Sequence, residues 1–340
     1  MKYEIGGMCM IISEAQQINE CFGFKGDVSV VRDMCRVMTK QGQICIKKIS
    51  YGMDRLVFIH NAKEYLIKNG FSFVDRFYVA PDGKPYIVLN DEIYVAFDWI
   101  NGGECDFKKL EHVKIATETL ANFHKCIEGY LPSEGIKSRD EMGLLPSTLQ
   151  KRTEELLRLK KVGQKSRSRF DFLFIDNVDF FVQRSNASIE IINSQVYSRL
   201  LKAAKERREY CHRDYSFHNL AFDISENLYI QNFDCLCGEV KVYDIASFLR
   251  KIMGEYNWNV DVALRVVNWY DTINKIDNDE IAILVALMEF PQKFWRIANR
   301  YYNSRRTRPE NGFYNKLLDV IHEKEVYKEF TINFKSQTGV

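Results

Sequence analysis

Hydrophobic and polar positions follow two different periods along this chain, and both occur within its first hundred residues. Residues 29–49 look like a β-hairpin with its turn at Lys40-Gln41-Gly42, because the second stretch alternates between apolar and polar side chains up to Lys47. Residues 53–69 instead carry apolar side chains at helical spacing and are followed by Gly70. This second pattern predicts one amphipathic helix that ends at the glycine.

The spacing of apolar residues changes from that of strands to mainly that of helices after Gly102-Gly103. Before that point, residues 71–79 and 84–100 predict two further strands around the turn signal Pro81-Asp82-Gly83-Lys84. After it, the spacing is that of helices, with a charged and exposed connection at residues 160–169. The predicted helices cover residues 109–127, 143–162, 190–209, 244–256, 259–273, 277–287, 291–303 and 311–330, with short strands between the third and the fourth.

This order of elements predicts an α+β protein with two lobes. We expect a β-rich N-terminal lobe at residues 1–97, a hinge at residues 98–104 and a mainly helical C-terminal lobe at residues 105–340. The chain has 340 residues, of which 46% are hydrophobic, so it is long and apolar enough to bury a large core.

Composition and charge narrow the choice of partners and compartment. The formal net charge is only +2, which gives no electrostatic reason to expect nucleic acid as a partner. No run approaches the roughly 18 apolar residues of a membrane helix, and the first residues lack the layout of a signal peptide. We therefore expect no membrane contact and synthesis in a cytoplasm. The nine cysteines are scattered, which favours reduced thiols over disulfides or a zinc site.

One segment, CHRDYSFHNLAFDISENLYIQNFD at residues 211–234, concentrates the side chains that phosphoryl transfer needs. His212, Asp214 and Asn219 form the pattern H-x-D-x-x-x-x-N. Such a loop can bring a carboxylate to the acceptor hydroxyl and an amide oxygen to Mg²⁺ beside the same phosphate. We assign Asp214 as the catalytic base, Asn219 as a metal ligand and His212 as structural support for the loop.

A second metal ligand, usually an aspartate, is expected at the end of the next strand. The apolar alternation of Leu228 and Ile230 places Asn232 at that position, and Asp234 follows two residues later. The sequence leaves open which of the two would face the metal. Asp244 in Y-D-I-A opens a helix, so we assign it a structural role, either as a cap or as an acceptor for backbone N–H groups of the loop.

The nucleotide side of the site is predicted from the β-rich part. Lys47 follows Ile-Cys-Ile on a strand, as does the lysine that holds nucleotide phosphates in V-A-I-K. Backbone groups near Trp99 and Ile100 would then meet the adenine base in a cleft beneath Lys47. These assignments predict ATP and Mg²⁺ as the cofactors.

In their order along the chain these motifs resemble the aminoglycoside-phosphotransferase and choline-kinase branch of the protein-kinase-like fold. The matching elements are Lys47, W-I-x-G at 99–102, L-A-x-F-H at 120–124, H-x-D-x-x-x-x-N, N-F-D and Y-D-I-A. Residues 288–303, MEFPQKFWRIANRYYN, resemble the F-P-x-K-F-W signature of CotS-type spore-coat proteins of endospore-forming Firmicutes. The resemblance runs from about residue 18 to 335. It implies an aminoglycoside-phosphotransferase-like fold, a role in sporulation, synthesis in the mother cell, a place in the spore coat and other spore-coat proteins as partners.

Two departures from the family pattern imply weakened ATP and Mg²⁺ binding, as in a pseudokinase. The position of Asn232 is usually Asp in the wider family, and an amide brings no charge to a Mg²⁺ that favours carboxylates. The glutamate that normally pairs with the strand lysine should lie near Ile59-His60, but the nearest acids, Asp54 and Glu64, are about a turn away.

The literal H-R-D does not make this chain a eukaryotic-type protein kinase. The only glycine in residues 27–51 is Gly42, so there is no glycine-rich phosphate loop. Nine residues separate Asp234 from Asp244, which leaves no room for an activation loop. Arg213 is therefore expected to be solvated rather than to bind a phosphorylated side chain.

A basic stripe between Pro291 and Pro309 suggests an anionic substrate or partner. Arg296 and Arg300 stand at i, i+4 and share one helical face. The alternative is a solvated face beside a core anchor formed by Phe294 and Trp295. The stripe consists of Lys293, Arg296, Arg300, Arg305, Arg306 and Arg308.

Three functions are compatible with these observations. The first is a spore-coat protein with a kinase-like fold that is a degenerate or weakly active phosphotransferase. The second is an active ATP-dependent kinase of a small molecule or sugar, with Asp214 as base. The third, an aminoglycoside-resistance enzyme, would need an acidic pocket for its polycationic substrate, and the basic stripe argues against it. The sequence decides neither whether the chain is an enzyme nor what its substrate is.

Overall fold

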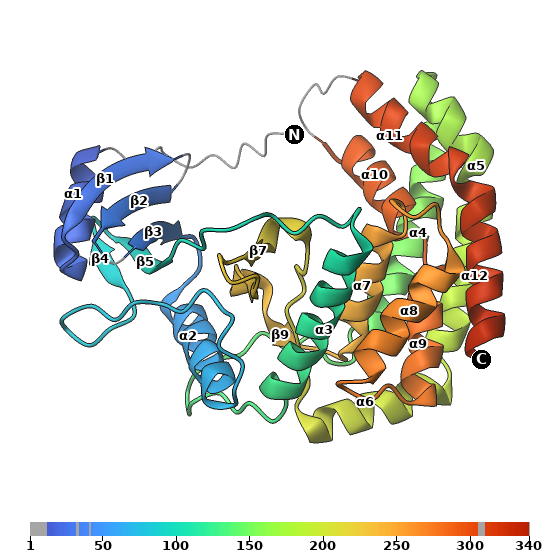
Figure 1. Ribbon diagram of the computed structural model, residues 1–340. Coiled ribbons are helices and arrows are strands. Elements are labelled where there is room, and N and C mark those ends of the chain that lie inside the picture. Colours follow the sequence, from blue (N-terminus) through green and yellow to red (C-terminus); the bar gives the residue numbers. More distant parts are fainter. Residues whose placement is uncertain (1–11, 32–33, 41, 305–309, 340) are drawn as a thin grey trace. The chain divides into compact units, whose positions relative to one another are not determined.

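The computed structural model describes residues 12–31, 34–40, 42–304 and 310–339, and these form two compact units (Figure 1). The first unit comprises Met1–Asp106, Tyr130–Arg139 and Asp214–Leu236. The second comprises Phe107–Gly129, Asp140–Arg213 and Cys237–Val340. Both units are thus discontinuous in sequence, whereas the lobes expected at 1–97 and 105–340, with their hinge at 98–104, follow the chain linearly and stay a prediction.

The first unit is built on an antiparallel five-stranded sheet in the order β1-β2-β3-β5-β4. Its strands are β1 (Gly26–Val31), β2 (Met34–Thr39), β3 (Gly42–Ile49), β4 (Ile87–Leu89) and β5 (Glu92–Asp98). The hairpin predicted at 29–49 is confirmed as β2 and β3, and the range also takes in the end of β1. Gln41 of its predicted turn lies outside the described residues.

One strand was predicted for residues 71–79 and one for residues 84–100, and both predictions are wrong. Residues 84–100 hold two strands, because the chain reverses at Asn90 and Asp91, whose φ angles are 51° and 62°. Asparagine and aspartate tolerate this left-handed conformation, so local turn chemistry overrides the apolar alternation. Residues 71–79 make only isolated bridges, such as Val74 with Ile230.

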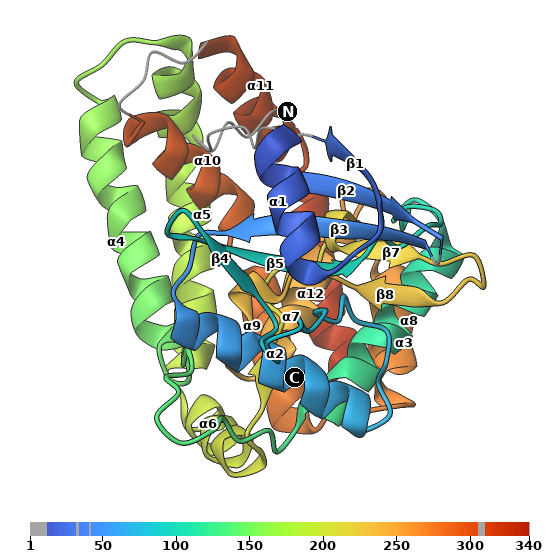
Figure 2. The same ribbon diagram turned by 90° about the vertical axis from the view of Figure 1, so that its left-hand side faces the viewer.

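Two helices accompany this sheet. Helix α1 (Ile12–Phe22) lies over one face of it (Figure 2), where Ala15, Ile18 and Phe22 pack into an apolar cluster with Val37 and Ile46. Helix α2 (Met53–Lys68) confirms the helix predicted at 53–69. Its buried face includes Leu56, Ile59, Lys63 and Leu66, so one of the inward-facing side chains is a lysine.

The later segments of the first unit form a small hairpin beside the region of residues 73–75. Strand β7 (Leu220–Phe222) pairs with β8 (Leu228–Ile230), and the short 3₁₀ turns η1 (Phe217–Asn219) and η2 (Phe233–Cys235) flank the hairpin. The Ile230 N–H donates to the Phe73 carbonyl at 2.9 Å. This pairing ties the end of β8 to the chain that follows α2.

The second unit is helical apart from the short pair β6 (Tyr210–Cys211) and β9 (Cys237–Gly238). Its helices are α3 (Leu110–Ile127), α4 (Leu145–Gly163), α5 (Arg169–Ile192), α6 (Gln195–Arg207), α7 (Val242–Ile252), α8 (Val260–Asp271), α9 (Asn278–Glu289), α10 (Gln292–Tyr302), α11 (Glu310–His322) and α12 (Lys324–Thr338). None of the helices among the described residues is both long and apolar enough to cross a membrane.

Most of these helices agree with the sequence prediction to within a few residues, but α5 was missed. Its start is marked by a capping box in which Ser168 and Asp171 satisfy each other's backbone N–H groups, a signal present in the sequence. The helix predicted at 190–209 therefore covers the end of α5 and then α6. The single helix predicted at 311–330 is two helices, α11 and α12.

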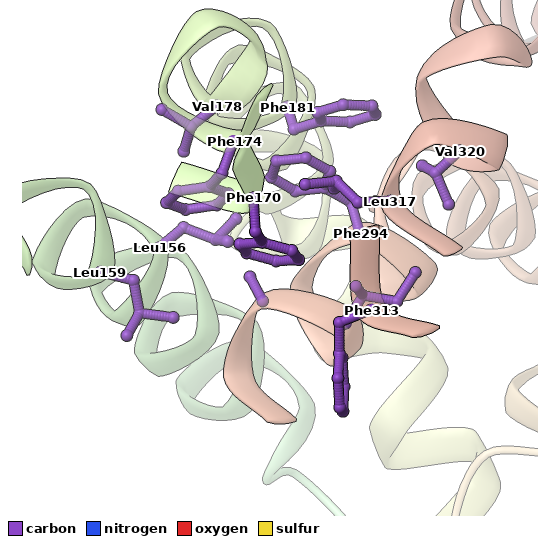
Figure 3. Close-up of a cluster of buried hydrophobic side chains, with 12 residues drawn as sticks. Leu156, Leu159, Phe170, Phe174, Val178, Phe181, Phe294, Phe313, Leu317 and Val320 are labelled. Atoms are coloured by element: carbon purple, nitrogen blue, oxygen red, sulfur yellow. The ribbon is translucent and has the colours of Figure 1, made fainter. Parts of the chain in front are cut away.

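An aromatic cluster forms the core between α5, α10 and α11 (Figure 3). The rings of Phe181 and Phe294 stack at 3.9 Å between centroids, and Phe170 and Phe174 continue the cluster along α5. Phe294 is fully buried, as expected of the core anchor beside the basic stripe.

Candidate functional site

Lys47 of β3 reaches both side chains that compete for the predicted metal position. Its Nζ lies 2.8 Å from Asp234 Oδ2 and 3.1 Å from Asn232 Oδ1. The three residues line a cleft of about 580 Å³ within the first unit. The sequence had left open which of Asn232 and Asp234 faces this cleft; both do.

The backbone at Asn232 explains how both residues turn the same way. Strand β8 ends at Ile230, and Asn232 then adopts the left-handed conformation with φ 61° and ψ 67°. The 3₁₀ turn that follows carries Asp234 to the Lys47 side. Asparagine is one of the few residues that enter this conformation at low cost, so its presence here has a structural reason besides any metal role.

A buried ion pair fixes the backbone of Asn232. The Asn232 N–H donates to Asp75 Oδ2 at 3.0 Å, while Asp75 Oδ1 lies 2.7 Å from the Nζ of Lys63. The Lys63 and Asp75 side chains are 1% and 5% exposed, so this pair lies almost wholly outside water. Burial lowers the pKa of Lys63, although the Asp75 charge opposes the shift.

Sequence reasoning missed this pair. It looked for an acid on α2 near residues 59–60, whereas α2 supplies a cation and the chain after it supplies the acid. Glu64, one of the two nearest acids, forms a bidentate pair with Arg76 instead. The available signal was Lys63 itself, a charged residue at an apolar position of the helical repeat.

The backbone of η2 is fixed by Arg55 from the first turn of α2. Arg55 donates to the carbonyl oxygens of Asp234 and Leu236. Tyr51, just before α2, lines the cleft on the same side. Burial raises the pKa of Tyr51, and the neighbouring Asp234 charge raises it further. Arg55 of α2 therefore fixes the backbone of this turn, while Lys47 of β3 contacts the Asp234 carboxylate.

The predicted base and the predicted metal ligand of the loop contact each other. Asn219 Nδ2 donates to Asp214 Oδ2 at 2.8 Å and to the Asp214 carbonyl at 2.8 Å. The Asn219 Oδ1 in turn lies 3.4 Å from the Asn232 Nδ2. A continuous series of contacts thus links Lys47, Asn232, Asn219 and Asp214.

Of the two predicted adenine neighbours, Trp99 has its backbone donor already engaged. The Trp99 N–H donates to the Gln43 carbonyl at 2.8 Å, as a continuation of the sheet beyond β5. Both Trp99 and Ile100 line the cleft. The contact of Trp99 and Ile100 with an adenine base stays a prediction.

In the second unit, Asp244 supports the two residues that precede Asp214 in the sequence. Its carboxylate accepts the N–H groups of His212 at 2.6 Å and of Arg213 at 2.9 Å. His124 Nε2 lies 3.3 Å from the same carboxylate. Burial alone would raise the pKa of Asp244, but these interactions outweigh it and the pKa is lowered. The His212 ring is fully buried and packs edge-on against Phe123.

Arg213 is not solvated, contrary to expectation. Its side chain is 16% exposed, lies 3.8 Å above the Tyr243 ring and is within 4 Å of carboxylates of both Glu239 and Glu141. Burial raises the pKa of Glu239 to about 7. Two internal acids thus serve as counter-charges of Arg213.

The basic stripe lies on α10. Arg296 and Arg300 are exposed, and Lys293 pairs with Glu323 at 3.3 Å. Arg305, Arg306 and Arg308 lie outside the described residues. The role of Arg296 and Arg300 toward a substrate or partner stays a prediction.

The chain is similar to a known protein family and to several solved structures. Residues 15–334 match the model of the family described as "Spore coat putative kinase YutH". An aminoglycoside phosphotransferase from Alicyclobacillus acidocaldarius has a similar structure, with TM-score 0.87 and 18% identity over 99% of both chains. Spectinomycin phosphotransferase APH(9)-Ia, solved with ADP and spectinomycin, gives TM-score 0.61 and 14% identity over 93% of this chain and 98% of that chain. Macrolide 2′-phosphotransferase MphH from Brachybacterium faecium gives TM-score 0.53 and 9% identity over 88% and 96%.

These findings confirm the resemblance drawn from the motifs. The α+β phosphotransferase fold predicted from the sequence is also confirmed. Because the sequence identities are this low, the similarity to these solved structures establishes only the fold.

Proposed function

The chain belongs to the YutH family of spore-coat kinase-like proteins, and from this premise we propose that it is a nucleotide-binding coat protein with weak phosphotransferase activity. The observation that carries the proposal is the contact between Lys47 and Asp234 at 2.8 Å. Asp234 is the one carboxylate among the predicted metal ligands Asn219, Asn232 and Asp234. The lysine expected to hold phosphates is therefore paired with the acid expected to hold the metal.

The side chains around the cleft fit Mg²⁺ and ATP in kind. Asp234 offers a carboxylate, and Asn219 and Asn232 offer amide oxygens, which are the hard oxygen ligands that Mg²⁺ takes. When bound, Mg²⁺ would neutralise charge on the nucleotide phosphates. Lys47 is placed to contact the phosphates, and Asp214, held by Asn219, is placed to accept a proton from an acceptor hydroxyl.

Charge explains why the activity should be weak. A site with Asp at position 232 would carry two carboxylates, but this one carries one, and Lys47 already neutralises it. A unit charge at ~4 Å is worth about 4 kcal/mol at an effective dielectric of ~20. Lys47 and Asp234 are 30% and 34% exposed, so solvent screens much of that energy. Nucleotide binding must also separate a pair that is already satisfied.

An active kinase of a small molecule or sugar is the second candidate. It is favoured by the contact of Asp214 with Asn219, since base and metal ligand already stand together. In either case we place the protein in the spore coat, among other coat proteins or with an anionic small molecule, on the strength of the family alone.

Calorimetric titration of the full chain with Mg·ATP, together with a thermal melt and a phosphate-release assay, tests the proposal. We expect measurable but weak binding, a small rise in Tm and turnover far below that of dedicated kinases. A ligand that binds only the folded state must stabilise it. Lys47→Met serves as the control and should abolish the rise in Tm. Fast turnover would refute the weak-enzyme assignment, and a Tm unchanged at saturating Mg·ATP would refute nucleotide binding itself.

A further inference from the structure

A groove runs along helix α4 of the helical unit, where α4 packs against α10 (Figure 1). It measures about 500 Å³, which is within the range of ~300–1,000 Å³ typical of small-molecule sites. Trp295 of α10 is the aromatic side chain in its wall, and α4 supplies the polar ones. These polar side chains are Thr148, Lys151, Arg152, Glu154, Glu155 and Arg158. A wall of this kind favours a polar ligand.

The two acids of the groove already have donors from this chain. Glu155 accepts from the Trp295 indole N–H at 2.8 Å and from the Asn303 side-chain amide at 3.0 Å. The Arg158 Nη2 lies 3.7 Å from the same carboxylate. Glu154 is exposed and accepts from a side-chain amide one turn earlier on α4, at 2.8 Å. The acids therefore pair with groups other than the two cations that precede them in the sequence.

Those cations are Lys151 and Arg152, and uncharged groups hold the guanidinium of Arg152. Its Nη1 donates to Gln292 Oε1 at 2.8 Å, and its Cζ lies 4.4 Å from the centre of the Trp295 ring, which packs against the aromatic core. In the part of the chain that the structure describes, no carboxylate lies within ion-pair distance of either cation. An arginine has five N–H donors, so most of them are left for a ligand. Because stacking fixes the guanidinium in advance, an anion that binds it restricts little further side-chain motion.

We propose that this groove binds a phosphorylated sugar, whose phosphate is held by Lys151 and Arg152. A phosphate monoester carries a charge of about −1.5 to −2 at pH 7, which matches two cations, whereas a carboxylate would match only one. The planar guanidinium meets two phosphate oxygens in parallel hydrogen bonds. Glu154 and Glu155 have lone pairs left for sugar hydroxyls and repel a second anionic group. This site requires neither nucleotide binding nor phosphoryl transfer, so it stands or falls separately from the function proposed above.

Titration of the full chain with glucose 6-phosphate, without nucleotide or Mg²⁺, tests the proposal by calorimetry and Trp fluorescence. Three related probes separate the parts of the ligand: glucose lacks the phosphate, inorganic phosphate lacks the sugar, and glucuronate carries a carboxylate instead. We expect glucose 6-phosphate to bind at least about tenfold more tightly than each of them, and its affinity to fall with added salt. Equal binding of inorganic phosphate would overturn the sugar assignment, and equal binding of glucuronate or glucose the phosphate assignment. No binding of glucose 6-phosphate at millimolar concentration would overturn the site itself.

Variants locate the binding. Lys151→Gln and Arg152→Gln should each weaken glucose 6-phosphate at least about fivefold, whereas Lys161→Gln, at another exposed lysine of α4, should not. If Arg152 serves only to pack on Trp295, Arg152→Gln will lower Tm and leave the affinity unchanged, which would refute its role. Lys151 is exposed, so its variant keeps the test open if Arg152→Gln folds poorly. Lys47→Met should bind glucose 6-phosphate as wild type does, and a loss of binding there would assign the phosphate to the other cleft and refute this groove.

Discussion

Replacing Asn232 by Asp should strengthen Mg·ATP binding, and the structure allows the size of the effect to be worked out. The backbone cost is small because aspartate tolerates the left-handed conformation nearly as well as asparagine. The new carboxylate would stand where Asn232 Oδ1 now stands, 3.1 Å from Lys47 Nζ. Lys47 could then pair with one carboxylate while the other carboxylate binds the metal.

The magnitude follows from one added charge beside the metal. At ~4 Å and an effective dielectric of ~20 it is worth about 4 kcal/mol. The neighbouring Lys47 and Asp234 are 30% and 34% exposed, so we keep about a third of that energy after solvent competition. The expected gain is ~1.4 kcal/mol, or about tenfold in affinity. Without metal the variant should melt slightly lower, because its carboxylate faces Asn219 Oδ1, which now lies 3.4 Å from the Asn232 amide nitrogen.

The assay is calorimetric titration of Mg·ATP into wild type, Asn232→Asp and Asp234→Asn. Asn186→Asp, on an exposed position of α5 in the other unit, adds the same charge and controls for net charge. We expect tighter binding only for Asn232→Asp, with phosphate release as a second readout. No gain in Asn232→Asp together with a loss in Asp234→Asn would show that Asp234 alone serves the metal and that the charge argument fails.

Asp214→Asn should abolish any phosphate release yet leave the Tm nearly unchanged, and retained turnover in that variant would exclude Asp214 as the base. Lys63→Met leaves the buried Asp75 charge unpaired and should cost about 3–5 kcal/mol in a urea titration, whereas the double variant Lys63→Met/Asp75→Asn should lose less than the sum of the single changes. Glu239 has a folded pKa of about 7 against its ordinary value of 4.5, so the folded state holds the proton more tightly. Its contribution to stability is therefore full below pH ~4.5 and lost as pH rises to ~7, and Glu239→Gln should flatten that part of the Tm profile against pH.

Elements that depend on local pattern could be predicted from the sequence. Helix α2 and most helices of the second unit follow from apolar spacing, and the hairpin of β2 and β3 follows from alternation and a turn. Where local turn chemistry competes with the apolar pattern, prediction fails, as at Asn90-Asp91, whose left-handed angles split one expected strand into two. Helix α5 was missed because a charged segment hides its capping box at Ser168.

The site shows the same division between local and distant information. The spacing of Asp214 and Asn219 predicts that they meet, and their side chains are hydrogen bonded. That Asn232 and Asp234 face the same cleft could not be predicted, because it depends on one left-handed residue and the turn after it. The acids that pair with Lys63 and Lys47 are set by tertiary contacts, and no local sequence pattern predicts which acid pairs with a given lysine.

The charges of the cleft explain the two departures from the family pattern together. Two lysines and two aspartates form two pairs: Lys63 with Asp75 behind Asn232, and Lys47 with Asp234 in front of it. In the family pattern an acid on the helix would engage the strand lysine and leave the metal-site aspartate unpaired. Here the helix supplies a cation, so Lys47 takes its counter-charge from Asp234. An uncharged residue at position 232 then adds no charge to these two balanced pairs, whereas Asp there would place one more negative charge beside them without a metal. The loss of the helix acid and the loss of the metal-site aspartate thus compensate each other in a cleft that is stable without nucleotide, at the expense of its affinity for Mg²⁺.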